Sequence, residues 1–306
     1  MLNIWRLKLL IQFQTLGTMQ QVSEVMHTSI ASVSQQLNLL EQDTNLKLFE
    51  KVGRRVQLTH EGHALVKKVR PVINQLEDIE NALKDKSEDI QGTVRIAAFT
   101  SALEKIVIPA ASKLSKEHPK LEIQLTELEP DKSIPAIDAY QFDIAVVAYT
   151  EKTHLLEKNY REVIKLGSDK LKVLVSDKNP LAKHAQISIE QLEKENWVLE
   201  PDGTYLSNHT KKLCVSAGFE PNVINVVQNY LTMHLLIAEN LAVGILPELA
   251  IIKSMKNVCV LDLKLDESRD IYLVARKSTT TTRAMQVVTK ALSNKELILS
   301  TIGTRF

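Results

Sequence analysis

The stretch that decides the fold of the N-terminal segment is residues 17–62, GTMQQVSEVMHTSIASVSQQLNLLEQDTNLKLFEKVGRRVQLTHEG. Its pattern predicts two short helices separated by a tight turn and followed by a basic β-hairpin, which together make a winged helix-turn-helix. A first helix is expected before it, at residues 3–16, because apolar residues recur there on one helical face. These apolar residues are Ile4, Leu7, Leu10, Ile11 and Phe13.

Local capping signals set the bounds of the three helices. Gly17 ends the first helix, since glycine enters the left-handed conformation without steric cost. Thr18 is placed to cap a short second helix. After the turn at residues 27–28, Ser29 can cap a third helix that ends near Gln42. The side chains expected to face inward from the second and third helices are Met19, Val22, Val25, Met26, Val33, Leu37 and Leu40.

The opposite face of the third helix carries short polar side chains. Such side chains can bond to base edges or phosphates without holding the backbone away from the groove of DNA. A generic helical cap whose polar residues only face solvent would show the same pattern. The candidates for DNA contact on the two helices and at their starts are Thr18, Thr28, Ser29, Ser32, Ser34, Gln35 and Asn38.

The predicted hairpin has strands at residues 48–50 and 55–58. Lys51, Arg54 and Arg55 would lie at its tip and side, where a wing meets phosphate. Residues 1–70 contain nine Lys and Arg residues against five Asp and Glu residues, a local charge of +4, whereas the whole chain carries +1. Positive charge is therefore concentrated in the segment expected to approach a polyanion.

The order of motifs in this segment resembles the LysR-type transcriptional regulators, whose winged helix-turn-helix binds DNA. The chain departs from the family at Ile30, where the family usually places a DNA-contacting glutamine. Isoleucine forms no hydrogen bond and can touch only a thymine methyl group or a sugar edge. Asn45 replaces a glycine and can imitate it in a left-handed turn. The matching runs are VSEVMHTS at residues 22–29, VSQQL at 33–37, LE at 40–41, LFEK at 48–51, RR at 54–55 and LTHEG at 58–62.

Length and composition describe a globular chain with room for several domains. Its 306 residues, 44% hydrophobic and 25% charged, predict two or three domains with large cores. No apolar run approaches the ~20 residues that a membrane span needs, and the N-terminus lacks the pattern of an export signal. We therefore expect a cytoplasmic protein in which Cys214 and Cys259 are buried thiols rather than a redox pair.

Residues 61–86 predict one long helix with a near-heptad apolar stripe. Pro71 should kink it, because a proline inside a helix removes a hydrogen bond. The stripe packs either on the chain's own domains or on a second copy. We favour dimerisation, which the family resemblance implies for this helix. The candidate dimerisation residues are Val66, Val69, Ile73, Leu76 and Leu83, with Val72 and Ile79 widening the stripe.

From Gly92 onward strands alternate with helices, which predicts an α/β fold with largely parallel sheets. This part resembles the effector-binding domain of the same family, which has two lobes like a periplasmic binding protein. The expected strands are residues 93–98, 121–127, 143–147, 171–176, 197–199, 223–227 and 271–275, and the expected helices are 99–114, 207–217 and 231–239. Pro247, which follows residues 242–246, suits a further helix start. The expected domains are a winged helix-turn-helix at 1–60, a linker helix and hinge at 61–90, and an effector-binding domain at 91–306 with lobe I at about 91–163 and 267–306 and lobe II at about 164–266.

A small molecule is expected at the carboxyl ends of strands and near helix N-termini, where ligands of open α/β sheets gather. Thr100 and Ser101 follow the first strand of this domain and are the first candidates, although helix capping explains them equally well. The resemblance suggests an opposite wall and a lobe junction that contribute further residues. These are Pro201, Asp202, Thr204, Tyr149 and Gln228, of which Asp202 would repel an anionic effector.

Other classes of function find less support in the sequence. It contains no GxxxxGK[ST], GxSxG or GxG motif, so we do not expect an enzyme. His60 and His63 are three residues apart with no evident third ligand, so neither a metal nor a cofactor is expected. The main alternative is a solute-binding receptor, which would need an export signal and would have no use for a basic wing. A structural coiled-coil adaptor would leave the two-lobed part without a purpose.

The sequence therefore predicts a DNA-binding transcriptional regulator whose third helix enters the major groove. An effector bound between the lobes would change how the subunits are arranged on DNA. The expected partners are double-stranded promoter DNA, a small-molecule effector, further copies of the chain in a homodimer or homotetramer, and RNA polymerase.

Overall fold

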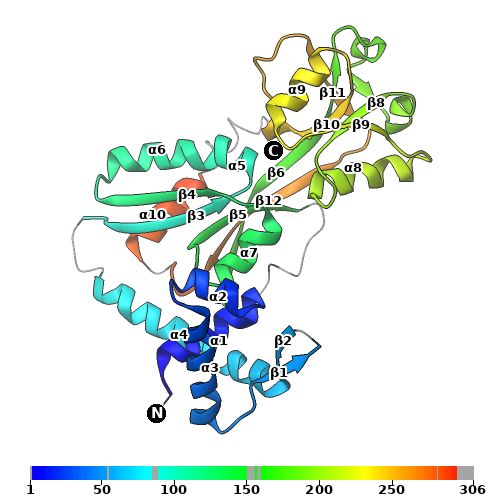
Figure 1. Cartoon of the computed structure of the whole chain (residues 1–306). Coiled ribbons are helices and arrows are strands. Elements are labelled where there is room, and N and C mark those ends of the chain that lie inside the picture. Colours follow the sequence, from blue (N-terminus) through cyan, green and yellow to red (C-terminus); the bar gives the residue numbers. More distant parts are fainter. Residues whose placement is uncertain are drawn as a thin grey trace. The chain divides into compact units, whose positions relative to one another are not determined.

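The computed structural model describes residues 2–53, 55–84, 89–149, 156, 160–280 and 282–294, and its contacts divide the chain into two compact units. Unit 1 contains the expected DNA-binding segment, the linker helix and most of lobe I, and unit 2 contains most of lobe II (Figure 1). Unit 1 comprises Met1–Val147, Thr153–Ile164 and Tyr272–Asn294, and unit 2 comprises Ala148–Lys152, Lys165–Ile271 and Lys295–Phe306.

The N-terminal module of unit 1 is the winged helix-turn-helix that the sequence predicts. Its elements are α1 (Ile4–Leu16), α2 (Met19–Val25), α3 (Ile30–Thr44), β1 (Phe49–Val52) and β2 (Arg55–Leu58), the last two paired antiparallel. The side chains of Asn3, Thr18 and Ser29 accept backbone N–H groups at the starts of the three helices. Gly17 and Asn45 end α1 and α3 with φ of 81° and 51°, a left-handed conformation that glycine and asparagine tolerate.

One apolar core holds this module together. Val33, Leu37 and Leu40 of α3 are fully buried, as predicted, and the rings of Phe13 and Phe49 meet edge to face with centroids 5.2 Å apart. The prediction that Ile4 belongs to the buried face of α1 is wrong. Its side chain is 48% exposed, so the buried stripe of that helix begins at Leu7.

The long helix α4 (His60–Lys84) follows the wing and contains Pro71. Val66, Val69 and Ile73 are buried in the core of the module, and Leu76 packs against it half-buried. Val66, Val69 and Ile73 are therefore covered by the chain's own module, the alternative that we did not favour, because an apolar stripe shows that a helix face is covered but not by which partner. The apolar side chains of α4 that do face solvent are Val72, 50% exposed, and Ile79, 57% exposed. The side chain of Leu83 lies outside the described residues.

Unit 1 also contains an α/β layer. β3 (Gly92–Ala98) pairs in parallel with both β4 (Leu121–Glu127) and β5 (Ile144–Tyr149), as expected for strands joined by helical crossovers. The helix expected between β3 and β4 is divided into α5 (Thr100–Ala102), a π-helical turn (Leu103–Val107) and α6 (Ile108–Glu117). Pro109 lies in the first turn of α6, where proline is tolerated. The remaining helices are α7 (Pro130–Asp138) and α10 (Arg283–Leu292).

Two long strands, β6 (Arg161–Ser176) and β12 (Ser268–Arg276), run through both units. In unit 2, β6 pairs antiparallel with β10 (Gly244–Pro247) and β11 (Val258–Leu263), and β11 pairs in parallel with the short β7 (Gln186–Ile187). β8 (Asn196–Leu199) and β9 (Asn222–Val226) form a separate parallel pair, and each is followed by a helix, α8 (Tyr205–Ser216) or α9 (Tyr230–Ala238). Trp197 of β8 is fully buried in the core of this unit.

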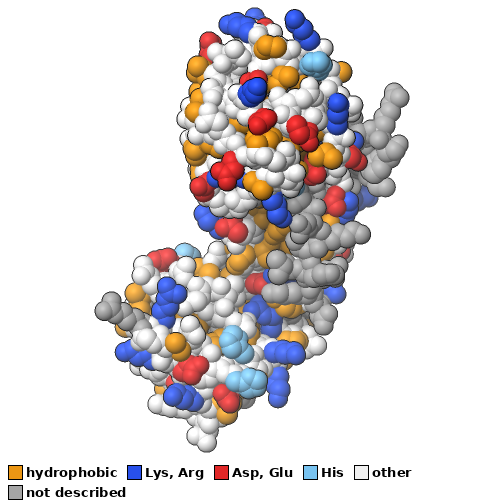
Figure 2. All heavy atoms as spheres, turned by 90° about the vertical axis from the view of Figure 1, so that its right-hand side faces the viewer, with side chains coloured by type: hydrophobic (Ala, Val, Ile, Leu, Met, Phe, Trp, Pro, Cys, Tyr) orange, Lys and Arg blue, Asp and Glu red, His pale blue; other side chains and the backbone are white. Residues whose placement is uncertain are grey.

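Charged side chains of both signs are interspersed on the face that Figure 2 presents, in keeping with a chain of net charge +1. None of the helices in the described part of the chain combines the length and apolar character of a bilayer-spanning segment.

Candidate nucleic-acid interface and effector-binding region

The outward face of α3 carries the predicted DNA-contacting side chains. Ile30, Gln35 and Asn38 are exposed, and Ser34 is half-buried. Ile30, Ser34 and Asn38 follow one another at intervals of four residues, so they form one row along the helix. This face therefore presents one apolar side chain at the start of the helix and hydrogen-bonding groups further along it.

The hydroxyl groups at the helix starts have structural roles as well. Thr18 Oγ1 accepts from the Gln21 backbone N–H at 3.2 Å, and Ser29 Oγ accepts from the Ser32 N–H at 3.1 Å. Thr18 also donates to Gln21 Oε1 at 2.8 Å. Ser32 and Thr28 are half-buried. Capping leaves the exposed hydroxyls of Thr18 and Ser29 near the end of a helix dipole that favours an anion such as phosphate.

Glu41 attaches the wing to α3, a role that sequence reasoning missed. Its Oε1 atom accepts from the backbone N–H groups of Leu48 at 2.7 Å and Phe49 at 3.0 Å. Hydrogen bonds to a carboxylate are stronger than those between neutral groups. The signal was present in the sequence as the acid of the LE pair at residues 40–41, but without coordinates nothing indicated what the carboxylate would bind.

The motif at residues 58–62 closes the wing from the other side. Thr59 Oγ1 donates to the Lys47 carbonyl at 2.7 Å and accepts from the Gly62 N–H at 3.1 Å. A side chain at Gly62 would place its Cβ atom 2.5 Å from the Leu48 carbonyl oxygen. The glycine is therefore required by the close approach of two backbone segments, not by its own torsion angles.

The wing presents its positive charges on both faces. Lys51 pairs with Val56, and Arg55 pairs with Val52, in the antiparallel register. Because cross-strand partners share a face and neighbours alternate, the Lys51 and Arg55 side chains belong to opposite faces of the hairpin. Both are exposed, whereas Arg54 lies outside the described residues.

Two of the nine basic residues counted in residues 1–70 are used inside the fold. Arg6 forms an ion pair with Asp43 at 2.5 Å and donates from Nε to Gln36 Oε1 at 3.0 Å, which ties α1 to α3. Arg70 is only 7% exposed and donates to the Asp138 carbonyl and to Gln14. At most seven of the nine basic residues are therefore available to DNA.

The unit 1 effector candidates follow the carboxyl end of β3. Thr100 Oγ1 donates to Glu127 Oε1 at 2.7 Å, and Ser101 is completely buried. The Thr100 hydroxyl is therefore already engaged with a carboxylate at the end of the neighbouring strand β4. An effector that binds here has to compete for this hydroxyl or accept the Glu127 carboxylate as part of its site.

Three of the unit 2 effector candidates, Pro201, Asp202 and Thr204, lie between β8 and α8. Thr204 caps α8 and donates to the Pro201 carbonyl at 3.0 Å. Asp202 is exposed and ion-paired with Lys211 at 2.5 Å, which lowers its power to repel an anion. Gln228 is exposed at the end of β9, and Tyr149 is half-buried at the end of β5.

Glu200, which directly precedes these candidates, is a polar group that sequence reasoning missed. Burial raises the pKa of the Glu200 carboxyl, and the neighbouring Thr204 and Tyr230 hydroxyl groups and the charge of Arg269 partly offset that rise. Arg269 is itself paired with the buried Asp169 at 2.8 Å. Glu200 therefore joins the effector candidates by its position next to Pro201.

A winged helix-turn-helix joined by a long helix to an α/β ligand-binding part defines a class, the effector-responsive transcriptional regulators. Residues 4–63 match the family profile described as "Bacterial regulatory helix-turn-helix protein, lysR family". Residues 87–295 match the profile described as "LysR substrate binding domain". The chain therefore belongs to the LysR family of DNA-binding transcriptional regulators, with an effector-binding domain, as the resemblance predicted.

Several known proteins are similar to this chain over most of its length. The hydrogen peroxide-inducible genes activator of Haemophilus influenzae is 22% identical over 297 residues, 96% of this chain and 97% of that protein. The transcriptional dual regulator GltC of Bacillus subtilis is 25% identical over 71% of each chain. Among solved structures, a full-length OxyR variant from Pseudomonas aeruginosa has a TM-score of 0.69 at 16% identity, with 97% of this chain and 96% of that chain covered. Full-length CbnR in complex with its target DNA has a TM-score of 0.55 at 17% identity, with 96% and 100% covered.

Proposed function

We propose that this regulator reads promoter DNA with the outward face of α3 and holds the DNA backbone with its wing. The observation that carries the proposal is the row of Ile30, Ser34 and Asn38, beside the exposed Gln35, on a helix whose other face is fully buried. A helix packed in this way can enter a major groove without unfolding its module. Gln35 and Asn38 can pair with base edges, and Ile30 is suited to a thymine methyl group.

The remaining DNA contacts in the proposal go to phosphate. Thr18, Thr28, Ser29 and Ser32 are placed at the starts of α2 and α3, where N–H groups favour an anion. Lys51 and Arg55 are free of ion pairs among the residues that the structure describes, so each can neutralise a phosphate. Arg54 keeps the same proposed role from its place in the sequence, at the tip of the wing.

We assign effector binding to the helix starts that follow β3 in unit 1 and β8 in unit 2. The residues concerned are Thr100 and Ser101 in the first unit and Thr204, with its neighbour Glu200, in the second. Pro201, Asp202, Gln228 and Tyr149 stay candidates on the strength of their positions. The effector regulates DNA binding only if it binds two states of the protein with different affinities.

The proposal further includes self-association, a cytoplasmic location and an action on RNA polymerase without any catalytic step of its own. Self-association is assigned to the exposed apolar side of α4, which carries Val72 and Ile79. A second copy of this helix would remove both side chains from water in a homodimer, and two such dimers would make a homotetramer.

The experiment that tests the DNA-binding proposal measures affinity for a promoter fragment as a function of salt concentration. Replacing Lys51 and Arg55 with alanine is expected to weaken binding to every sequence and to lower the slope of log K against log salt by about one for each lost phosphate contact. Lys116→Ala, at an exposed position of α6, is the matched control and should leave the slope unchanged. A double variant with the slope of the native protein would remove the wing from the DNA interface.

A further inference from the structure

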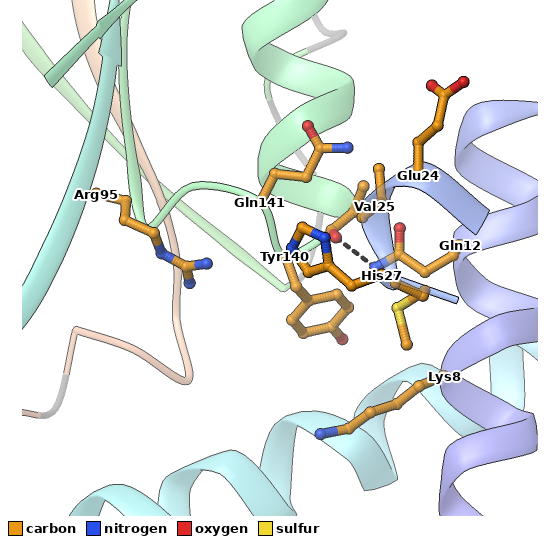
Figure 3. Close-up of a pocket in the computed structure, with 10 residues that line it drawn as sticks. Lys8, Gln12, Glu24, Val25, His27, Arg95, Tyr140 and Gln141 are labelled. Carbon is orange, nitrogen blue, oxygen red and sulfur yellow. Dashed lines mark hydrogen bonds between the residues drawn. The ribbon is translucent and has the colours of Figure 1, made fainter. Parts of the chain in front are cut away.

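The docking of the N-terminal module on the α/β layer of unit 1 leaves a cavity of about 470 Å³. One wall comes from α1 and from α2 with the turn that follows it, and the other comes from β3 and the end of α7 (Figure 3). The volume lies within the range of pockets that hold small organic ligands. Its lining residues include Lys8, Val25, His27, Arg95, Tyr140 and Gln141.

Two cations from different segments converge on this cavity. Figure 3 shows the Lys8 side chain extending from α1 and the Arg95 side chain extending from β3 into the same space. Lys8 is half-buried and has no ion pair among the described residues. Arg95 bonds to Asp143 through Nε at 3.2 Å and Nη2 at 3.1 Å, which leaves its Nη1 atom without a hydrogen bond in the described part of the chain.

The charge balance around Arg95 favours an anion. Asp143 is shared between Arg95 and Arg276, whose Nη2 atom lies 3.3 Å from the same carboxylate. One carboxylate thus faces two guanidinium groups. Glu24, the acid that lines the cavity, is exposed and accepts a hydrogen bond from Gln20.

The rest of the lining suits an apolar body attached to the anion. Val25, Met26 and the Tyr140 ring contribute apolar surface, and the Arg276 guanidinium lies over that ring, 4.6 Å from its centroid. Tyr140, in the turn that follows α7, has a left-handed backbone conformation with φ of 60°. Gln12, which also lines the cavity, donates to the Ala139 carbonyl.

We propose that this cavity is a second ligand site, distinct from the effector candidates at β3 and β8, and that it binds a small organic carboxylate or phosphate. The Lys8 ammonium and the Arg95 guanidinium bind the anionic group, and the apolar lining packs on the organic body. Lys8 belongs to the DNA-binding module and Arg95 to the α/β layer. A bound anion therefore stabilises the contact between these two parts of unit 1. His27, in the turn of the helix-turn-helix, lines the same cavity, so the ligand touches the turn before α3.

Calorimetric titration of the full-length protein at low salt tests the proposal with three probes. 3-Phenylpropionate and phenyl phosphate carry the two candidate anionic groups, and 3-phenylpropionamide has the shape of the first without its charge. We expect at least one anion to bind saturably at one site and the amide not to bind. The anion that binds identifies the carboxylate or phosphate class.

Three variants locate the binding. Lys8→Met should raise the Kd of the anion at least about tenfold, because it removes a charge-assisted contact. Gln141→Trp fills the cavity and should abolish binding, whereas Lys116→Met removes an exposed charge outside the cavity and should leave the Kd unchanged. Saturable binding of neither anion, equal binding of the amide, or native Kd values in both cavity variants would each overturn the proposal.

Discussion

Gly62 shows how a single residue determines whether the wing can close. Its Cα lies where the Leu48 carbonyl passes, and a Cβ atom would come within 2.5 Å of that oxygen. Gly62→Ala is therefore expected to force the backbone segments apart and lower the free energy of unfolding by about 1–3 kcal/mol. Thermal denaturation measures the loss, with Lys67→Ala on exposed α4 as the control. A native melting temperature for Gly62→Ala would show that the close approach is not required.

Cys214 is the residue whose chemistry the structure defines most clearly. It is fully buried in α8, and burial raises the pKa of its thiol to about 12. The thiolate, which is the reactive form, is therefore scarce at neutral pH. This agrees with the expectation of a buried structural thiol, whereas Cys259 is partly exposed.

A Cys259→Ser variant isolates the behaviour of Cys214. Alkylation of the folded protein by iodoacetamide at pH 8 is expected to be slower than alkylation of the urea-unfolded chain by roughly the thousandfold loss of thiolate between pKa values near 9 and 12. Because the folded state holds the protonated thiol, stability from this group is complete below about pH 9 and is lost as the pH rises toward 12. Equal alkylation rates in the folded and unfolded chains would contradict the burial of this thiol.

At the scale of elements, helix and strand positions followed largely from local signals. Asn45 and Gly17 end helices because of their own torsional preferences, and Ser29 caps α3 through its own side chain. Contacts between segments that are distant in the sequence could not be predicted from local signals. The burial of Arg70, the carboxylate clamp of Glu41 and the raised pKa of Glu200 each require a partner that is remote in sequence or set by the fold.

Helix α4 shows the same limit most clearly. Its apolar spacing predicted a covered face, which the burial of Val66, Val69 and Ile73 confirms, but the surface that covers it is the chain's own module.

The candidate site was predictable to a similar degree. The row on α3 could be placed from periodicity, whereas the engagement of Thr100 with Glu127 depends on two strands that meet only in the folded sheet.

The two faces of α4 predict different outcomes on mutation. Changing Val72 and Ile79 together to glutamate should convert the proposed dimer to a monomer with little change in melting temperature, since both side chains are exposed within one chain. Val69→Ala should instead destabilise the fold by about 2 kcal/mol and leave the assembly intact. Sedimentation velocity with thermal denaturation separates these effects. A dimeric double variant, or a monomeric Val69→Ala protein, would reverse the assignment of the two faces.

At the scale of the whole molecule, unit 1 links the DNA-binding module to the strand that continues into unit 2. Arg70 of α4 donates to the Asp138 carbonyl at 3.0 Å, and the Asp138 carboxylate pairs with Arg161, the first residue of β6, at 2.6 Å. Tyr160 lies beneath both guanidinium groups, at 5.1 Å from Arg70 and 5.7 Å from Arg161. These buried polar contacts connect the linker helix to the first residue of β6 within unit 1.

The most direct test of the central claim, that the outward face of α3 reads DNA sequence, is in vitro selection of duplexes from a randomised library by the purified full-length protein. The native protein is expected to enrich a partly palindromic motif, and a variant with Gln35→Ala and Asn38→Ala is expected to lose preference at specific positions of that motif while it still binds DNA in low salt. Enrichment of the same motif by both proteins, or of no motif by the native protein, would contradict the claim.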